Sequence, residues 1–295
     1  MTAEILDGKA LAKEMREEIR VETEALAKSG TRPGLAVLLV GEDPASVSYV
    51  RGKERALQEA GMHERDHRLP ADVSEERLLA LIREINDDPR IHGILVQLPL
   101  PDQIDSERVV AAIDPDKDVD GFHPVNLGRM IRGLDCFYPC TPHGVVKILE
   151  RAGIGIAGKE VVIVGRSNLV GRPLSIMLSQ KSDQGNATVT VCHSRTRNLA
   201  EHTRRAEILI AAAGAPRMIT SEMISEGTVV IDVGVNRVED PTAKKGYRLV
   251  GDVDYDGALE KASHITPVPG GVGPMTITML LYNTLLSAKR KASGG

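Results

Sequence analysis

The sequence contains no tryptophan, and only two phenylalanines and five tyrosines among its 295 residues. The core must therefore be aliphatic, as in Val/Ile/Leu-rich parallel strands covered by helices. No apolar run is long enough to span a bilayer, and the first residues have neither the basic start nor the apolar stretch of a signal peptide. Three cysteines do not make a disulfide framework in a chain of this length. We therefore expect a soluble, cytoplasmic protein without a membrane partner.

The charge pattern excludes further classes. The net charge is −4 and no basic block occurs, which argues against nucleic acid as a partner. A metal site is not indicated, because Cys136 and Cys140 have no second cysteine pair beside them. His63 and His67 are four residues apart, but they stand in a run of charged residues, which favours a surface position over a metal site.

Helix-like and strand-like segments alternate along the chain. In the first half, strands are predicted at 35–40 and 91–98, with helices at 8–28, 44–60, 74–86 and 106–113. Residues 114–142 are rich in Asp, Pro and Gly and mark a boundary. The second half has predicted strands at 161–164, 187–192, 207–212 and 228–233, a helix at 143–152, and a last amphipathic helix at 275–289. This order predicts two α/β domains, the second a Rossmann-like doubly wound sheet, with the active site in the cleft between them.

Residues 161–173, Val-Val-Ile-Val-Gly-Arg-Ser-Asn-Leu-Val-Gly-Arg-Pro, are the most informative stretch. Four β-branched residues predict a strand buried on both faces, Gly165 allows a sharp turn, and Gly171 and Pro173 stand at the start of a helix. Backbone N–H groups and the helix dipole make such a turn an anion site, typical of a dinucleotide pyrophosphate. The spacing differs from G-x-G-x-x-G and no P-loop lysine follows, so an ordinary βα turn is the alternative.

The end of the next predicted strand bears on the choice between NADP and NAD. In dinucleotide folds this point meets the adenosine ribose, where an acid binds a free 2′-hydroxyl and a basic residue binds a 2′-phosphate. The segment here is His193-Ser-Arg-Thr-Arg197, with two arginines, two hydroxyls and no acid, and Arg166 stands in the preceding turn. Arginine matches a phosphate in geometry and charge, so the sequence favours NADP. A solvated basic loop is the alternative.

Candidate chemical groups also occur in the first half. Tyr49 and Lys53 share one face of a predicted helix. A buried lysine with a lowered pKa could perform acid/base chemistry, whereas an exposed helical lysine is the alternative. The same Tyr-x-x-x-Lys pair is catalytic in short-chain dehydrogenases, but there it follows the nucleotide turn. Here it precedes that turn, which excludes simple membership of that family.

Three predicted loops contain the remaining candidate site residues. Gln97 and the following Leu-Pro-Leu-Pro101 lie at the carboxyl end of a predicted strand, where ligands of open α/β sheets bind, and one X–Pro bond there could be cis. Residues 117–121, Lys-Asp-Val-Asp-Gly, offer two carboxylates for a ligand or form a simple turn. Residues 266–276, Thr-Pro-Val-Pro-Gly-Gly-Val-Gly-Pro-Met-Thr, must form a loop whose glycines let a ligand approach the backbone and which opens onto a helix N-terminus.

Six of these blocks together resemble one family over nearly the whole chain. They are Gly41-Glu-Asp-Pro-Ala-Ser46 with Tyr49 and Lys53, and the blocks at 96–101, 117–122, 139–142, 164–167 and 267–276. Each block is weak alone, but six in order and spacing are very specific. The chain resembles the bacterial-type bifunctional methylenetetrahydrofolate dehydrogenase/methenyltetrahydrofolate cyclohydrolases.

The resemblance implies a reaction sequence and its partners. The dehydrogenase would oxidise 5,10-methylenetetrahydrofolate to 5,10-methenyltetrahydrofolate with NADP, and the cyclohydrolase would hydrolyse the product to 10-formyltetrahydrofolate. This chemistry belongs to one-carbon metabolism and purine biosynthesis. The partners would be tetrahydrofolate one-carbon derivatives and a second copy of the chain, in a homodimer formed through the cofactor domain. No metal is required by the reaction.

The resemblance also assigns roles to residues. Lys53 would be the central catalytic residue, with Tyr49 orienting the folate, Gln97 hydrogen-bonding Lys53, and Asp120 holding the pterin ring. The implied substrate-binding residues are Tyr49, Lys53, Val96, Gln97, Leu98, Asp120, Pro269, Gly270, Gly271, Val272, Gly273 and Thr276. The implied NADP-binding residues are Gly165, Arg166, Ser167, Ser194, Arg195, Thr196 and Val235.

The implied folate-binding, catalytic domain covers 1–141 plus 275–295, with the C-terminal helix returning to it. The implied NADP-binding domain covers 142–274. Two other functions are open from the residues themselves. A monofunctional folate dehydrogenase of the same fold would lack Lys53 or Gln97, and both are present. A non-catalytic dinucleotide-sensing module would not need the Tyr/Lys/Gln/Asp set in a separate domain.

Overall fold

The computed structural model describes residues 2–42, 44–243 and 246–294, except for the side chains of residues 44–49. The chain forms two compact units. The Rossmann-like unit comprises Met1–Ala12 and Thr141–Thr276, and the three-stranded unit comprises Lys13–Cys140 and Ile277–Gly295. The first and last long helices, α1 (Gly8–Lys28) and α10 (Val272–Ala292), contribute residues to both units.

The three-stranded unit is a parallel sheet in the order β3-β2-β4. Its further elements are β2 (Gly34–Val40), α2 (Pro44–Glu59), β3 (His63–Leu69), α3 (Glu75–Asp87), β4 (Gly93–Val96), α4 (Ser106–Ala111) and α5 (Pro124–Ile131). Every residue of the central strand β2 is buried, as its sequence Gly-Leu-Ala-Val-Leu-Leu-Val predicts.

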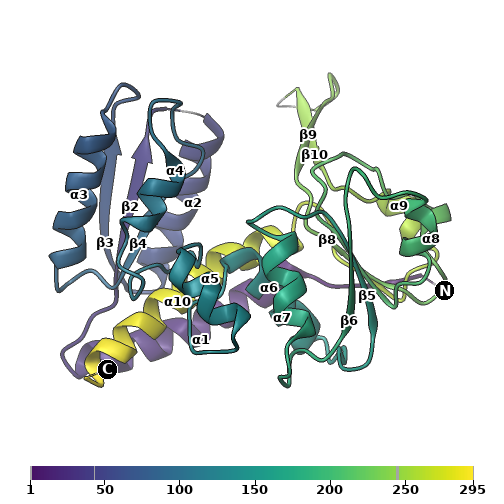
Figure 1. Ribbon diagram of the computed structural model, residues 1–295, viewed down its shortest axis with the longest axis horizontal. Helices are drawn as coiled ribbons and strands as arrows, with labels where there is room; N and C mark the ends of the chain where they lie inside the picture. The colour runs from purple at the N-terminus through teal and green to yellow at the C-terminus, as the bar shows by residue number, and fades with distance from the viewer. Residues whose placement is uncertain (1, 43, 244–245, 295) are drawn as a thin grey trace. The chain divides into compact units, whose positions relative to one another are not determined.

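Alternate residues of these strands face two different layers of helices. Ala36, Leu38 and Val40 pack with Ile94 and Val96 against the apolar faces of α3 and α4. Helix α2 contacts β2 and β3, and the sheet lies between α3 and α2 in Figure 1. Helix α3 begins with Ser74, whose side chain accepts a hydrogen bond from the Arg77 N–H, as the Ser-Glu-Glu pattern predicts.

The Rossmann-like unit is built on a six-stranded parallel sheet within the described residues, in the order β1-β11-β8-β7-β5-β6. Its strands are β1 (Glu4–Ile5), β5 (Glu160–Val164), β6 (Thr188–Cys192), β7 (Ile208–Ala211), β8 (Val229–Asp232) and β11 (His264–Ile265), and the antiparallel pair β9 (Asn236–Glu239) and β10 (Tyr247–Val250) stands apart. Its helices are α6 (Cys140–Arg151), α7 (Gly171–Ser179), α8 (Leu199–Thr203), the 3-10 turn η1 (Ser221–Met223) and α9 (Tyr255–Leu259).

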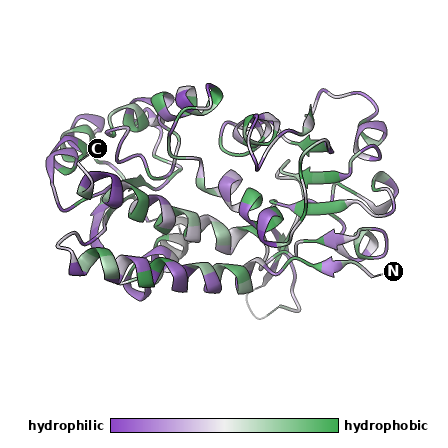
Figure 2. Ribbon diagram, turned by 90° about the horizontal axis from the view of Figure 1, so that it is seen from below, coloured by the Kyte–Doolittle hydropathy of each residue, from purple (hydrophilic) through white to green (hydrophobic). Residues whose placement is uncertain are grey.

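Both faces of this sheet are covered, which confirms the doubly wound prediction. Val162, Val164 and Leu209 belong to an apolar cluster with residues of α8, η1 and α9, and Figure 1 shows α6 and α7 on the other side of the sheet. The middle strands are drawn green in Figure 2, because nearly all of their residues are apolar. A strand buried on both faces needs such a composition.

The structure contains elements that the sequence patterns did not predict. The charged run His63–Leu69 is an edge strand of half-buried and exposed residues rather than a simple surface turn. Helix α5 lies in the segment expected to be irregular, and α10 begins at Val272, three residues before the expected start. Glu4–Ile5 pairs with β11, so the first residues belong to the Rossmann-like unit and not to the range 1–141 expected for the first domain.

None of the helices in the described part of the chain combines the length and the apolar character needed to cross a membrane. All three cysteines are buried with free thiols.

Candidate active site

Lys53 lies at the carboxyl edge of the three-stranded sheet, in a buried polar cluster. Helix α2 supplies Lys53, which is only 8% exposed, and its Nζ donates to Gln97 Oε1 at 2.9 Å. Gln97 follows β4 directly, and its backbone N–H donates to the Leu38 carbonyl, which holds it against β2. The structure thus brings Lys53 and Gln97 together, as expected from the resemblance.

The amide of Gln97 is fixed on both sides. Its Nε2 donates to the Leu98 carbonyl at 2.9 Å, so Oε1 is left to accept from Lys53. The Leu98–Pro99 bond is cis, which decides between the isomers that the sequence left open. Val96 is buried at the end of β4, and Leu98 is half-buried. The Tyr49 side chain lies outside the described residues.

Asp120 is the charge that interacts most strongly with Lys53. Burial lowers the pKa of Lys53, and the Asp120 carboxylate opposes this shift. Burial raises the pKa of Asp120, and Lys53 opposes that shift in turn. The two pKa values therefore move toward each other, which suits a pair that exchanges a proton near neutral pH.

The structure separates the roles of the two carboxylates in residues 117–121. Asp118 is buried and accepts hydrogen bonds from the backbone N–H groups of Gly121, Phe122 and His123, at 3.2, 3.2 and 2.8 Å. It also accepts from Asn126 Nδ2 at 2.9 Å. Asp118 therefore shapes the loop, as the turn alternative predicts, whereas Asp120 interacts with Lys53.

Cys140, a neighbour of Lys53 and Asp120, and Asn283, a neighbour of Cys140, were not identified from the sequence as parts of the site. Cys140 is buried, its Sγ donates to the Val119 carbonyl at 3.3 Å, and it interacts with the carboxyl group of Asp120. Asn283 of α10 donates through Nδ2 to the carbonyls of Val119 and Tyr138, at 2.8 and 3.1 Å. The motif Pro139-Cys-Thr-Pro142 contains Cys140, but only the three-dimensional contact shows its relation to Asp120.

The second group of site residues lies at the carboxyl edge of the Rossmann-like sheet. After β5 the chain first adds β6 on one side and then crosses to add β7 on the other side. The carboxyl ends of β5 and β7 are therefore the point at which the winding direction reverses, where open α/β sheets bind their ligands.

The turn after β5 fits a dinucleotide. Gly165 has φ +135°, and a Cβ there would lie 2.0 Å from the Ala212 carbonyl oxygen, while a Cβ on Gly171 would lie 2.1 Å from the Gly165 carbonyl oxygen. Only glycine permits this packing. Helix α7 starts at Gly171, and its N-cap Val170 makes no side-chain cap. No side chain caps the first turn of α7, where the Arg172 N–H donates to the Ser167 carbonyl at 3.1 Å and Pro173 has no N–H, which leaves the Gly171 N–H for a pyrophosphate.

Polar side chains surround this turn. Arg166, Ser167, Ser194 and Arg195 are exposed. Thr196 Oγ1 accepts from the His193 N–H at 2.9 Å and closes the turn after β6. These side chains are accessible to a 2′-phosphate at the end of β6, where the sequence predicted one.

Two buried carboxylates hold the neighbouring loops in place. Asp252 accepts from the N–H groups of Ala213, Gly214 and Ala215, at 2.6, 2.9 and 2.9 Å, and from Asn236 Nδ2 at 2.8 Å. Asp232 accepts from the N–H groups of Gly234, Asp252 and Val253, at 2.9, 3.0 and 2.9 Å. Val235 follows Gly234 and is 50% exposed, which makes it accessible to a ligand.

The Gly/Pro loop 266–276 also belongs to the Rossmann-like unit. The Gly271 N–H donates to the Pro267 carbonyl and the Lys9 N–H to the Gly270 carbonyl, both at 2.8 Å. Thr276 Oγ1 hydrogen-bonds Thr141 Oγ1 at 2.9 Å. Pro269 is exposed, Gly270 and Gly273 are half-buried, and Gly271 and Val272 are buried. The loop is therefore a defined structure, as its composition predicted.

Among the residues that the structure describes, no group of three or more His, Cys, Asp or Glu side chains is arranged to hold a metal ion.

The fold and these two groups of residues define a class. It is a dinucleotide-binding α/β protein with a second α/β unit that carries a buried lysine–carboxylate pair. Two family models match the chain: the catalytic domain of tetrahydrofolate dehydrogenase/cyclohydrolase over residues 6–120, and the NAD(P)-binding domain of the same family over residues 139–292.

Two bacterial relatives match nearly the whole chain. The chain is 58% identical over 289 residues to the bifunctional protein FolD of Geotalea uraniireducens, covering 98% of this chain and 100% of that protein. It is 55% identical over 293 residues to the bifunctional protein FolD of Bacillus subtilis, covering 99% and 100%.

Solved structures agree. The FolD methylenetetrahydrofolate dehydrogenase/cyclohydrolase of Campylobacter jejuni has 47% identity and a TM-score of 0.92, covering 97% of this chain and 99% of that one. The Trypanosoma brucei enzyme, solved with NADP and an inhibitor, has 41% identity and a TM-score of 0.93, covering 99% of each chain.

The chain belongs to the tetrahydrofolate dehydrogenase/cyclohydrolase family. It is a bifunctional enzyme, both an oxidoreductase and a hydrolase, and its cofactor is NADP. It oxidises 5,10-methylenetetrahydrofolate to the methenyl form and hydrolyses that product to 10-formyltetrahydrofolate.

Proposed function

We propose that Lys53 is the residue that moves protons in the cyclohydrolase step. The observation that carries this proposal is its buried contact with Gln97 Oε1 beside Asp120. Water that adds to the methenyl carbon must lose a proton, and a proton must also move between the folate nitrogens. A lysine whose pKa is lowered by burial can accept and return a proton near neutral pH.

Gln97 and Asp120 support this role in different ways. Gln97, held by the Leu98 carbonyl, accepts a hydrogen bond from Nζ and so orients the amine. Asp120 provides the countercharge for the protonated amine, and we propose that it also holds the pterin ring. Tyr49 is proposed to orient the folate from the same helix. Val96 ends β4, and Gln97 and Leu98 follow it directly.

The dehydrogenase step depends on alignment more than on a strong base. NADP, when bound, accepts the hydride that leaves the methylene carbon. The chain's own task is to hold the two reactants in a reactive geometry and to exclude water. We propose that loop residues Pro269, Gly270, Gly271, Val272, Gly273 and Thr276 line the folate site.

Gly165, Arg166, Ser167, Ser194, Arg195, Thr196 and Val235 are proposed to hold NADP. The glycine turn supports a pyrophosphate, and the exposed Arg166, Ser194 and Arg195 support a 2′-phosphate. Arg166 stands in the β5 turn itself and is therefore the first residue to test.

The experiment is a steady-state assay of cofactor reduction with methylenetetrahydrofolate, run in parallel with NADP and NAD. We expect turnover with NADP and little with NAD. In Arg166→Gln, kcat/KM for NADP should fall about 10- to 100-fold, since a charge-assisted hydrogen bond is worth about 1.5–3 kcal/mol, while kcat/KM for NAD should change little. Arg205→Gln is the matched control, because it removes an exposed arginine of the same unit that lies beside Glu160, at the start of β5.

Each outcome has a separate meaning. A preference for NAD in the parent protein would contradict the 2′-phosphate site but not the folate reaction. An equal loss for both cofactors in Arg166→Gln would give that residue a general structural role. No turnover with either cofactor would contradict the proposed function as a whole.

We propose further that residues 1–141 with 275–295 supply the folate-binding, catalytic part, and residues 142–274 the NADP-binding part. Within the first range, the residues of β1 pair with the Rossmann-like sheet. We also propose a cytoplasmic homodimer formed through the cofactor domain, serving purine biosynthesis. The three free, buried thiols suit a reducing compartment. The dimer and its interface can be tested by sedimentation equilibrium.

A further inference from the structure

A cavity lies at the amino edge of the three-stranded sheet, the edge opposite to Gln97. Its volume is about 380 Å³, in the range typical of small-molecule sites. The lining residues are Gly30, Thr31, Arg32, His63, Pro89, Arg90, His92, Lys291 and Ala292. They include three permanent cations and two histidines, and none of these described lining residues is acidic.

The position separates this cavity from the catalytic cluster. His92 accepts from the Gly34 N–H at the start of β2, whereas Gln97 donates to the Leu38 carbonyl four residues further along that strand. Four strand residues span about 13 Å. The cavity is therefore not part of the Lys53 site, and none of its residues has a role in the proposed reaction.

The cations are held in place by backbone carbonyls. Arg32 donates through Nε to the Gly61 carbonyl at 2.9 Å and through a terminal nitrogen to the Met62 carbonyl at 3.2 Å. Lys291, in the last turn of α10, donates to the Pro89 carbonyl at 3.1 Å. These contacts fix the two side chains, and no described acidic group pairs with either of them.

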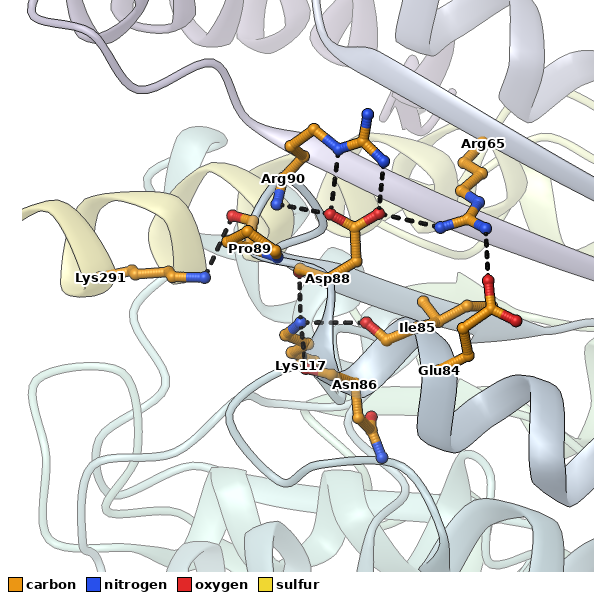
Figure 3. Close-up of polar contacts among 9 residues, drawn as sticks. All are labelled: Arg65, Glu84, Ile85, Asn86, Asp88, Pro89, Arg90, Lys117 and Lys291. Atoms are coloured by element: carbon orange, nitrogen blue, oxygen red, sulfur yellow. Dashed lines mark hydrogen bonds and ion pairs between the residues drawn. The ribbon is translucent and has the colours of Figure 1, made fainter.

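Figure 3 shows how the acidic groups behind the cavity are already engaged. Asp88 accepts two hydrogen bonds from the Arg90 guanidinium, at 3.1 and 2.8 Å, and a third from Arg65 at 2.9 Å. One carboxylate thus serves two arginines, with Glu84 as the second partner of Arg65. Lys117 donates to three carbonyls, those of Ile85, Asn86 and Asp88. Asp88 and Glu84 therefore match the charges of Arg65 and Arg90, and the carboxylates of Asp87 and Asp114 also interact with Lys117.

His92 reports the same field. Its pKa is lowered to about 4, chiefly by burial and in addition by the charges of Lys291 and Lys117. The ring is neutral at pH 7. It lines the cavity and accepts the hydrogen bond from the Gly34 N–H at the start of β2. The positive charge of the cavity that no described carboxylate matches thus comes from Arg32 and Lys291, whereas Arg90 is paired with Asp88.

A structural explanation accounts for part of this arrangement. Helices α3 and α10 end here, and cations stabilise the negative ends of helix dipoles. Lys117 fits that explanation, since its ammonium group caps the carbonyls at the end of α3. Arg32 and Arg90 do not, because Arg32 binds the carbonyls of the loop before β3 and Arg90 pairs with a side chain.

We propose that this cavity is a binding site for a small phosphate-bearing anion, held by Arg32, Arg90 and Lys291. Guanidinium groups match a phosphate in geometry, and the lysine adds a mobile point charge. The volume accommodates more than one phosphate group, so pyrophosphate and phosphomonoesters are both candidates of the same chemistry.

Isothermal titration calorimetry of the purified protein with NADP at saturation tests the site, because the cofactor occupies the other expected phosphate site. The probes are inorganic phosphate, pyrophosphate and adenosine monophosphate, in separate titrations. The variants are Lys291→Gln and Arg90→Gln. Lys289→Gln is the matched control, since Lys289 lies in the same last turn, pairs with Glu22 and does not line the cavity.

We expect saturable binding of pyrophosphate at one site per chain, weakened about tenfold or more by Lys291→Gln and unchanged by Lys289→Gln. The tightest of the three probes then identifies free phosphate, pyrophosphate or a phosphomonoester as the ligand type. Lys291 is exposed near the end of α10, so this variant keeps the test valid even if Arg90→Gln fails to fold. Absence of saturable binding for all three probes, or equal binding by the parent and Lys291→Gln, would overturn the proposal.

Discussion

Each unit has its own parallel sheet and carries its candidate site residues at the carboxyl edge of that sheet. The residues are buried in one unit and exposed in the other. In the three-stranded unit, Lys53 is 8% exposed and interacts with Asp120, whose pKa is raised by burial. In the Rossmann-like unit, Arg166 and Ser194 are exposed, and the site depends on a backbone turn in which Gly165 and Gly171 leave no room for a Cβ.

This difference follows from what each site must do. Proton transfer near neutral pH requires groups whose pKa values are shifted, and burial is the strongest means of shifting them. Binding a dinucleotide requires N–H groups and a close backbone approach, for which exposed side chains are sufficient partners. Substitutions should therefore separate the two activities, with side-chain changes decisive in one unit and backbone changes in the other.

Lys53→Gln tests this separation with the largest expected effect. The cyclohydrolase rate should fall at least about 100-fold, because glutamine cannot take up the proton, and general acid/base groups contribute about 10²–10⁴-fold. NADP affinity should stay within about twofold, since Lys53 belongs to the other unit. The measurements are hydrolysis of methenyltetrahydrofolate and equilibrium binding of NADP.

Arg55→Gln is the matched control for this variant. Arg55 lies on the same helix two residues further on, and its side chain is 82% exposed beside Glu59. It should retain the parent cyclohydrolase rate. A near-normal rate in Lys53→Gln would remove the catalytic role of that lysine.

Gly165→Ala tests the backbone side of the comparison. The new Cβ would lie 2.0 Å from the Ala212 carbonyl oxygen, at a φ of +135° that alanine rarely adopts. The β5 turn must shift, so we expect NADP affinity to fall about 10- to 100-fold, with a smaller change in the cyclohydrolase rate. Equilibrium binding of NADP and the two activity assays give this ratio directly.

Gly155→Ala provides the control in the same unit. No atom lies within 4 Å of a Cβ built at Gly155, so this substitution should leave NADP binding unchanged. If Gly165→Ala bound NADP as the parent does, or if both activities fell equally, the separation between the two units would be wrong.

Much of the fold was predictable because its main signals are local. The runs of β-branched and aliphatic residues around β2, β5 and β7 predict buried parallel strands, and Ser74 marks the start of α3. The strand β3 escaped prediction because its sequence His-Glu-Arg-Asp-His-Arg-Leu is charged, and its pairing with β2 overrides its composition. The two-residue strand β1 carries no periodic signal at all.

The site was predictable to the extent that its groups stand at strand ends or in a specific motif. Lys53, Gln97 and Gly165 satisfied that condition. The contacts of Cys140 with Asp120 and with Asn283 did not, because they join side chains far apart in the sequence. The residues of 117–121 alone did not distinguish Asp118 from Asp120, which only the resemblance did, and the hydrogen bonds to Asp118 now separate the two carboxylates in the structure.

The smallest predicted effect concerns the pH dependence of stability in the three-stranded unit. The folded pKa of His92 is about 4, below the usual 6.5, so unfolding takes up a proton between these two values. The free energy of unfolding therefore falls as pH drops from 6.5 toward 4. The full shift corresponds to about 3 kcal/mol. His92 is only 3% exposed but lines the cavity, and screening by solvent there reduces the expected effect to about 1 kcal/mol.

His92→Asn should reduce this acid sensitivity by about 1 kcal/mol. The asparagine side chain can still accept from the Gly34 N–H, as His92 Nδ1 does, but it does not titrate. Urea unfolding followed by circular dichroism at pH 7.5 and pH 4.5 gives the difference between the two free energies of unfolding for each protein. Any constant cost of the substitution appears at both pH values and cancels. The same difference in parent and variant would show that His92 is not protonated on unfolding in this window, and the positive field assigned to the cavity would lose this support.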